Sequence, residues 1–99
     1  MIIVAGTLQI EKDDARLAEP HIVEVMQKTA LEKGCITYRF SKDLQTVGLF
    51  QIYEEWESKK DLDAHSKSSH IAAFLEVLST KNIIARDLKV FEAVDIRTL

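Results

Sequence analysis

The fold is decided by the stretch ITYRFSKDLQTVGLFQIYEEWE, residues 36–57, which reads as two strands joined by a turn. In residues 36–43 apolar and polar side chains alternate with the period of two that is typical of a strand. Residues 48–57 form a second strand-like segment, and the polar segment DLQTVG between them ends in a glycine. We therefore expect an antiparallel β-hairpin in the middle of the chain.

The hairpin is preceded by a predicted strand and a predicted helix. Residues 2–10 are mostly β-branched and apolar, which favours a strand. Residues 13–33 read as a helix whose first turn Asp13 and Asp14 can cap. Pro20 either kinks this helix or begins its main part after a short first turn. Apolar positions at helical spacing mark the face expected to pack on the core: Ala18, Ile22, Val25, Met26 and Thr29.

The hairpin is followed by two short helical pieces and a last strand. Helical patterns cover residues 59–66 and 69–79, and residues 83–96 return to a strand. The order β-α-β-β-α-β predicts an α+β fold of the ferredoxin-like type, with a four-stranded antiparallel sheet. Both helical segments would then cover one face of the sheet and leave the other face open.

The open face of this sheet is expected to need a partner. Within residues 48–57, Leu49 and Tyr53 alternate with Phe50 and Ile52, so both faces of the strand carry apolar side chains. One layer of helices buries only one of these faces. We therefore expect a second copy of the chain on the open face, forming a homodimer.

Composition and charge restrict the class of protein. A chain of 99 residues with 46% hydrophobic and 29% charged residues fits one globular domain, which we place at residues 1–99. The formal charge of -3 and the lack of a basic run argue against a nucleic-acid partner. No apolar stretch reaches the ~20 residues of a membrane span, and no basic region precedes the apolar N-terminus. We expect a cytoplasmic protein without membrane contacts, and Cys35, the one cysteine, allows no internal disulfide.

The end of the hairpin carries two candidate site residues. Strand alternation places Glu54 on the same face as Phe50 and Ile52, and a carboxylate on an apolar face is uncommon. Glu54 either has a partner at a pocket or reaches solvent at the end of the strand. Trp56, on the same face, either packs in the core or forms the wall of a cleft.

Two histidines follow in the helical segments. On a continuous helix the spacing of five places His65 and His70 about 140° apart, which argues against a shared metal ion. We expect no metal site. His65 is either an exposed or capping residue, or a base above the sheet, and His70 lies near the start of the later helix. By residue types alone, these groups suit proton transfer on a small apolar molecule in an apolar cleft.

Three segments resemble the antibiotic biosynthesis monooxygenase (ABM) domain family: GCITYRFSKD at 34–43, YEEWES at 53–58 and DAHSKSSHIAAF at 63–74. The resemblance implies a dimeric α+β barrel with a pocket between sheet and helices in each subunit. It also implies oxidation of a phenol or hydroquinone by O2 without metal, haem or flavin. The family includes haem-degrading members, but the residue about ten positions beyond His65, where that branch has its axial histidine, is Leu75 here.

The resemblance also suggests roles for individual residues. His65 would remove a phenolic proton, and Glu54 would orient His65 or share the proton. Tyr38 or Tyr53 would donate a hydrogen bond to the developing oxyanion, and His70 is a secondary candidate. The aromatic substrate would lie between Trp56, Phe40 and Phe74.

Two other functions remain open at this stage. One is an isomerase of a small carbonyl metabolite of the autoinducer-2-processing type, since the family also contains an isomerase of phosphorylated autoinducer-2. It would need an anion-binding group from Arg39, Arg86 or Arg97. The other is a non-catalytic dimer that binds a small apolar ligand.

Overall fold

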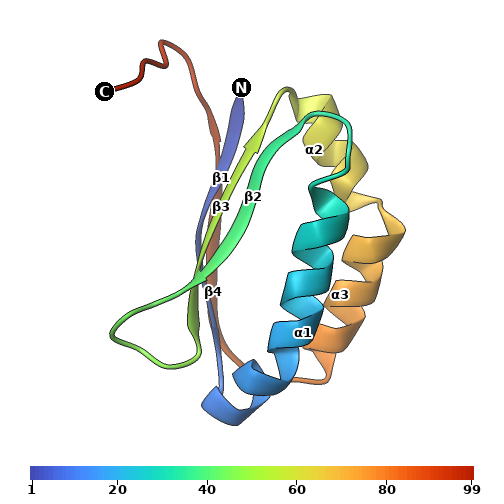
Figure 1. The fold of residues 1–99 in the computed structure, drawn as a ribbon, viewed down its shortest axis with the longest axis vertical. Helices are drawn as coiled ribbons and strands as arrows, with labels where there is room; N and C mark the ends of the chain where they lie inside the picture. The colour runs from blue at the N-terminus through green and yellow to red at the C-terminus, as the bar shows by residue number, and fades with distance from the viewer.

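The computed structural model describes residues 1–99 and has the element order β-α-β-β-α-α-β (Figure 1). The two helical pieces after the hairpin are separate helices, which the sequence pattern also separates. The elements are β1 (Ile2–Ile10), α1 (Lys12–Thr29), β2 (Cys35–Lys42), β3 (Leu49–Trp56), α2 (Lys59–Ser66), α3 (Ser69–Ser79) and β4 (Ile83–Glu92).

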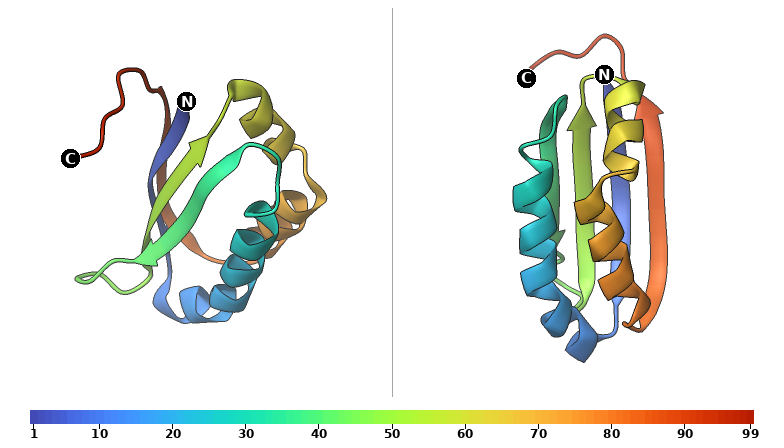
Figure 2. Two further views of the ribbon diagram at one scale, coloured as in Figure 1. Left: turned by 45° about the horizontal axis from the view of Figure 1, so that its top comes forward. Right: turned by 90° about the vertical axis from the view of Figure 1, so that its right-hand side faces the viewer.

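The four strands form one antiparallel sheet in the order β2-β3-β1-β4. All three helices lie on the same face of this sheet, and the other face is uncovered in the single chain (Figure 2). This confirms the predicted ferredoxin-like α+β fold. None of the helices combines the length and the apolar character needed to cross a membrane.

The core forms where the alternating side chains of the sheet meet the helices. Ile2, Val4, Leu8 and Ile10 of β1 point to the helix side and are buried. The predicted stripe of α1 packs against this face, and its residue Thr29 is fully buried. The face of the sheet that meets the helices is therefore the one on which any buried site must lie.

Helix α1 differs from its predicted bounds at both ends. Its N-cap is Glu11, whose side chain accepts hydrogen bonds from the backbone N–H groups of Asp13 and Asp14. The two aspartates therefore stand in the first turn and do not cap the helix. The pattern predicts helix to residue 33, but α1 ends at Thr29 because a series of tight turns then leads the chain back toward β2. The helix runs through Pro20 without ending there.

Strand β4 is shorter than the apolar pattern of residues 83–96 predicts, and it ends at Glu92. Glu92 is aligned with Ile2, the first residue of β1. Beyond it, the carbonyl of Met1 accepts one hydrogen bond from the N–H of Ala93. The regular pairing of β4 therefore ends at the level where β1 begins.

The open face of the sheet is less apolar than the sequence pattern indicates. The strand register places a polar row across it, in which Ser41, Gln51, Thr7 and Asp87 are successive neighbours. Apolar side chains occupy one end of this face, where Phe91 is 48% exposed. The open face therefore combines an apolar end with a polar centre.

Substituting Gly6 tests the close approach of β1 and β4. A Cβ at this position would lie 1.8 Å from the backbone oxygen of Asp87, so the two strands would have to separate. We expect Gly6→Ala to lower the free energy of unfolding by about 2 kcal/mol, measured by urea denaturation. Thr7→Ala at the next position is the control and should cost clearly less. A Gly6→Ala variant with wild-type stability would contradict this close approach.

Candidate functional site

A cavity of about 690 Å³ lies between the helix-covered face of the sheet and helices α2 and α3. Thirteen of its 19 lining residues are hydrophobic, which is typical of a site for a small organic molecule. The polar lining residues include Glu54 and His65, and Tyr38, counted among the thirteen, adds a hydroxyl group. The cavity therefore brings together the two residues that the sequence marks as candidate acid and base.

Glu54 lies in the middle of the sheet, where neighbouring strands hold it in place. It is aligned with Val4 of β1 on one side and with Tyr38 of β2 on the other. Its side chain is buried, and Oε1 accepts a hydrogen bond of 2.9 Å from Nε1 of Trp56. Burial raises the pKa of the Glu54 carboxyl, although the Trp56 bond and nearby His65 act in the opposite direction. Glu54 is thus a carboxyl group whose proton is held more tightly than usual.

His65 is the buried residue of α2, a helix that Ser58 caps at its N-terminus. Its ring packs beside Trp56 and Tyr38, with ring centroids 4.9 and 5.2 Å away. Nδ1 lies 2.6 Å from a carboxylate oxygen of Glu32. Because a carboxylate accepts, Nδ1 donates in this bond, and Nε2 makes no hydrogen bond within the protein. The ring is therefore held in one orientation with a free nitrogen.

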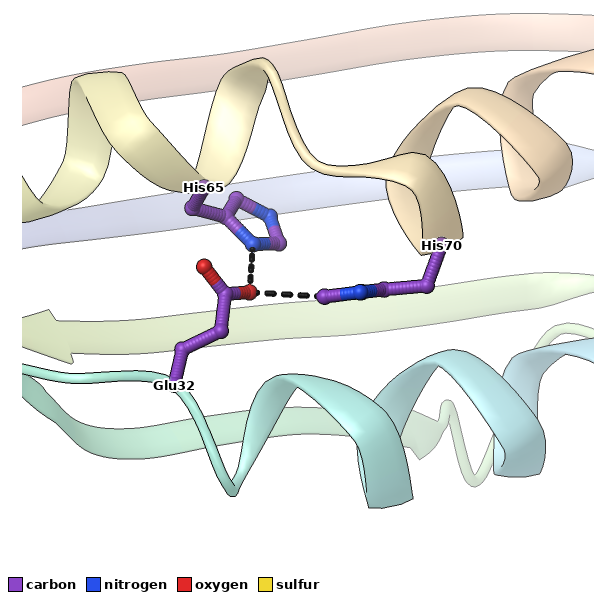
Figure 3. A group of neighbouring side chains, drawn as sticks. All are labelled: Glu32, His65 and His70. Atoms are coloured by element: carbon purple, nitrogen blue, oxygen red, sulfur yellow. Dashed lines mark hydrogen bonds and ion pairs between the residues drawn. The ribbon is translucent and has the colours of Figure 1, made fainter.

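Glu32 joins His65 to His70, as Figure 3 shows. The same oxygen, Oε2, accepts a second hydrogen bond of 2.7 Å from Nε2 of His70. Glu32 lies in the turns between α1 and β2, while the histidines belong to α2 and to the first turn of α3. One carboxylate thus connects the turn after α1 to two consecutive helices that lie more than 30 residues later in the sequence.

The convergence of the two histidines corrects the spacing argument from the sequence. That argument requires one continuous helix, but α2 ends at Ser66 and α3 begins at Ser69. The break brings the two rings to a centroid distance of 6.0 Å. The geometry of a single helix therefore does not decide where these side chains lie.

The residues Glu32, His65 and His70 offer possible metal-ligand atoms that all lie within 4.8 Å of one another. Around a tetrahedral zinc ion, bonds of ~2.1 Å place ligand atoms roughly 3.4 Å apart. The Glu32 oxygen is instead 2.6 and 2.7 Å from the two nitrogens, which are hydrogen-bond lengths. The arrangement fits a hydrogen-bonded cluster better than a set of metal ligands.

Tyr38, Phe40 and Phe74 line the cavity, as the proposed binding roles require. The rings of Phe40 and Phe74 meet edge to face with centroids 5.8 Å apart. Burial raises the pKa of the Tyr38 hydroxyl well above its ordinary value, and the Glu54 carboxylate adds to this effect. Tyr38 therefore remains protonated and can donate a hydrogen bond into the cavity.

The other three suggested substrate contacts lie outside the cavity lining. Trp56 is fully buried and acts on the site through Glu54 and His65. Tyr53 points to the open face, because adjacent strand residues alternate, and its hydroxyl donates to Glu55 at 2.8 Å. His70 contacts Glu32. None of the three therefore lines the cavity in the single chain, and their suggested roles as cleft wall, oxyanion donor and secondary candidate remain predictions.

Glu32 is the residue that the sequence reasoning missed. It stands in a turn, 33 residues before His65 and 38 before His70, with no local pattern that marks it. Its only sequence signal is its place two residues before the segment GCITYRFSKD that carries the family resemblance. A carboxylate in a turn is usually solvated, so its role follows from the tertiary structure alone.

The fold and the site together define a class: a ferredoxin-like α+β protein with an apolar small-molecule cavity that has acid–base groups on one wall. The chain belongs to the antibiotic biosynthesis monooxygenase family, whose model matches residues 1–77. Family membership confirms the resemblance carried by the three sequence segments. It places the chain among proteins described as monooxygenases, which act on small molecules.

Solved structures and a curated sequence are similar to this chain. A candidate antibiotic biosynthesis monooxygenase from Deinococcus radiodurans is 26% identical, with a TM-score of 0.92 over 100% of this chain and 98% of that chain. One from Nitrosomonas europaea shares the fold at 13% identity, with a TM-score of 0.87 over 95% and 99% of the two chains. An uncharacterized protein of Synechocystis is 24% identical over 99% of this chain and 67% of its own length.

The raised pKa of Glu54 predicts a specific dependence of stability on pH. The Glu54 carboxyl binds its proton more tightly in the folded state than in the unfolded state. Its contribution to stability is therefore lost as the pH rises above 4.5, the ordinary pKa of a glutamate carboxyl. We expect Glu54→Gln to gain stability relative to wild type between pH 4 and pH 7, measured by urea denaturation. Glu57→Gln, an exposed neighbour, is the control and should show no such trend. A loss of stability of Glu54→Gln relative to wild type over this pH range would contradict the raised pKa of Glu54.

Proposed function

We propose that this protein is a monooxygenase that oxidises a small phenol- or hydroquinone-like aromatic molecule with O2 and without a bound cofactor. The observation that carries the proposal is the orientation of His65, whose Nδ1 donates to Glu32 while Nε2 has no partner in the protein. Membership of the monooxygenase family and the apolar cavity beside this ring support it. Residues 1–99 would form one domain with this activity.

The proposed first step is a proton transfer to His65. With the proton on Nδ1 engaged by Glu32, Nε2 carries the lone pair that can accept a proton from a substrate hydroxyl. The positive charge that then forms on the ring lies 2.6 Å from a carboxylate oxygen, which stabilises it. The products of this step are a phenolate in the cavity and an imidazolium paired with Glu32.

The proposed second step is the reduction of O2 by the electron-rich phenolate. A carbon of the ring bonds to one oxygen atom, the O–O bond breaks, and the other oxygen leaves as water with two hydrogens from the substrate. A phenol thereby becomes a quinone, or a hydroquinone becomes a hydroxyquinone, and the substrate supplies all the electrons. His65 can return its proton to the departing oxygen, so the step needs no external reductant.

Tyr38 and Glu54 would assist at the same end of the cavity. Tyr38 stays protonated and can donate a hydrogen bond to the oxygen that becomes negative. Glu54, buried beside Trp56, can share a proton with the substrate or with His65. Phe40 and Phe74 would hold the aromatic ring between them and the base.

The roles of His65 and Glu32 can be measured through O2 uptake and product mass with a panel of hydroquinones. We expect His65→Ala to lower kcat by about 100-fold or more, because it removes the base. Glu32→Gln should lower kcat by roughly 10-fold with little change in KM, because the ring loses the charge that orients it. His21→Ala is the control, since His21 is exposed on α1. Unchanged turnover in His65→Ala would rule out the base role.

The two alternatives make different predictions for the same assay. An isomerase of a phosphorylated metabolite would need a group of cations in the cavity, but of Arg39, Arg86 and Arg97 only Arg86 lines it. It would also consume no O2. A non-catalytic binding protein would yield no product with any member of the panel.

We also propose that two copies of the chain associate through the open faces of their sheets. Phe91 and Tyr53 are 48% and 39% exposed on this face, which is the one that the helices leave uncovered. Pairing would bury these side chains, and the polar residues of the central row could hydrogen-bond across the interface. The cavities, on the opposite face of each sheet, would remain open.

The dimer is tested by light scattering coupled to size-exclusion chromatography. We expect wild type to elute as a dimer and Phe91→Asp as a monomer, because a charge would be buried in the interface. The matched control is Val23→Asp, which adds the same charge at a position 51% exposed on α1. A monomeric wild type, or a Phe91→Asp dimer, would contradict this interface.

A further inference from the structure

The cavity has two chemically different ends. Glu54 and His65 lie at one end, and Arg86 of β4 lines the other. The strand register aligns Val90 with Val4, and Val4 with Glu54, so Arg86 stands four residues along β4 from the level of Glu54. At ~3.3 Å per strand residue, this corresponds to about 13 Å along the sheet. A molecule that touched both ends would have to be elongated.

Arg86 is the one Lys or Arg side chain in the cavity lining, and no carboxylate of the protein pairs with it. Its neighbours Asp87 and Lys89 point to the opposite face of the sheet, where they pair with each other at 2.8 Å. Asp63 also lines the cavity, but it belongs to α2 and forms no ion pair with Arg86. The guanidinium charge is therefore free to bind a ligand.

The surroundings of Arg86 favour a carboxylate over a phosphate. One guanidinium can hold either group through two parallel hydrogen bonds, so the choice between them depends on the other charges nearby. Ser79, the last residue of α3, lines the cavity as well, and the C-terminal end of a helix carries a partial negative charge. That charge opposes a phosphate dianion more strongly than a carboxylate monoanion.

We propose that the substrate is an elongated aromatic acid, with a phenolic hydroxyl at His65 and a carboxylate bound by Arg86. The assignment of the phenolic end depends on the proposed function, whereas the binding of the carboxylate does not. The apolar side chains between the two ends, among them Leu8, Ile71 and Leu88, would contact the aromatic rings. Arg86 would thus select acids and fix the hydroxyl at the base.

Three probes of the same length separate charge from shape. They are 4′-hydroxybiphenyl-4-carboxylate, the matching uncharged carboxamide, and 4′-hydroxybiphenyl-4-yl phosphate. By isothermal titration calorimetry, we expect wild type to bind the carboxylate at least 10-fold more tightly than the carboxamide. Arg86→Met should abolish this preference and leave the carboxamide affinity unchanged, because the side chain keeps an unbranched apolar stem and loses its charge. Arg39→Met, on the open face, is the control and should retain the preference.

Several results would overturn the proposal. These are an equal affinity of wild type for carboxylate and carboxamide, a preference that survives in Arg86→Met, and tighter binding of the phosphate than of the carboxylate. Failure of all three probes to bind the folded wild-type protein would also count against it.

The result of this binding experiment does not depend on the proposed oxidation. His65→Ala should keep the preference for the carboxylate, since binding at Arg86 involves no proton transfer. If wild type prefers the carboxylate probe but consumes no O2 with any hydroquinone, the oxidation is wrong and the acid-binding end stands. If O2 is consumed and KM is the same for acids and amides, only the role of Arg86 is wrong.

Discussion

The arrangement of the site depends on one carboxylate oxygen. Oε2 of Glu32 accepts hydrogen bonds from His65 and His70, and so ties the turn after α1 to α2 and α3. The two helices are joined by a two-residue break at which Ser68 caps α3, and the two histidine side chains need a further constraint to stay together. The shared bond supplies that constraint in a largely buried place, where hydrogen bonds to a charge are strong. It also decides which nitrogen of His65 is left free.

The sheet separates two kinds of surface. Its helix-covered face holds the core and the cavity, and its open face carries a polar row with an apolar end. Because strand side chains alternate, each strand contributes to both surfaces: Glu54 and Trp56 face the cavity side, while Tyr53 and Glu55 face away from it. Substitutions on the open face can therefore alter the proposed dimer without changing the residues of the cavity.

Much of the fold could be predicted from local patterns. The bounds of β1, α2 and α3 agree with the predicted segments, because alternation and helical spacing are properties of neighbouring residues. The ends of α1 and β4 could not be predicted in this way. They depend on where the chain turns toward β2 and on where β1 begins, which no pattern within either element contains. The cavity lining includes neither Tyr53 nor Trp56, and a period of two could not show this, because it identifies a face but not what the face meets.

The local sequence was sufficient for the order of the elements and for the face that carries Glu54, because each follows from spacing along one segment. The choice of His65 as a candidate base came from the family resemblance. Only the tertiary structure shows that Glu32 meets both histidines, that the histidines converge across a helix break, and that Arg86 lies at the far end of the same cavity. Some of these contacts join residues up to 38 positions apart, and the position of Arg86 depends on the register between neighbouring strands. Such contacts depend on how the elements pack together, and a one-dimensional pattern does not record that packing.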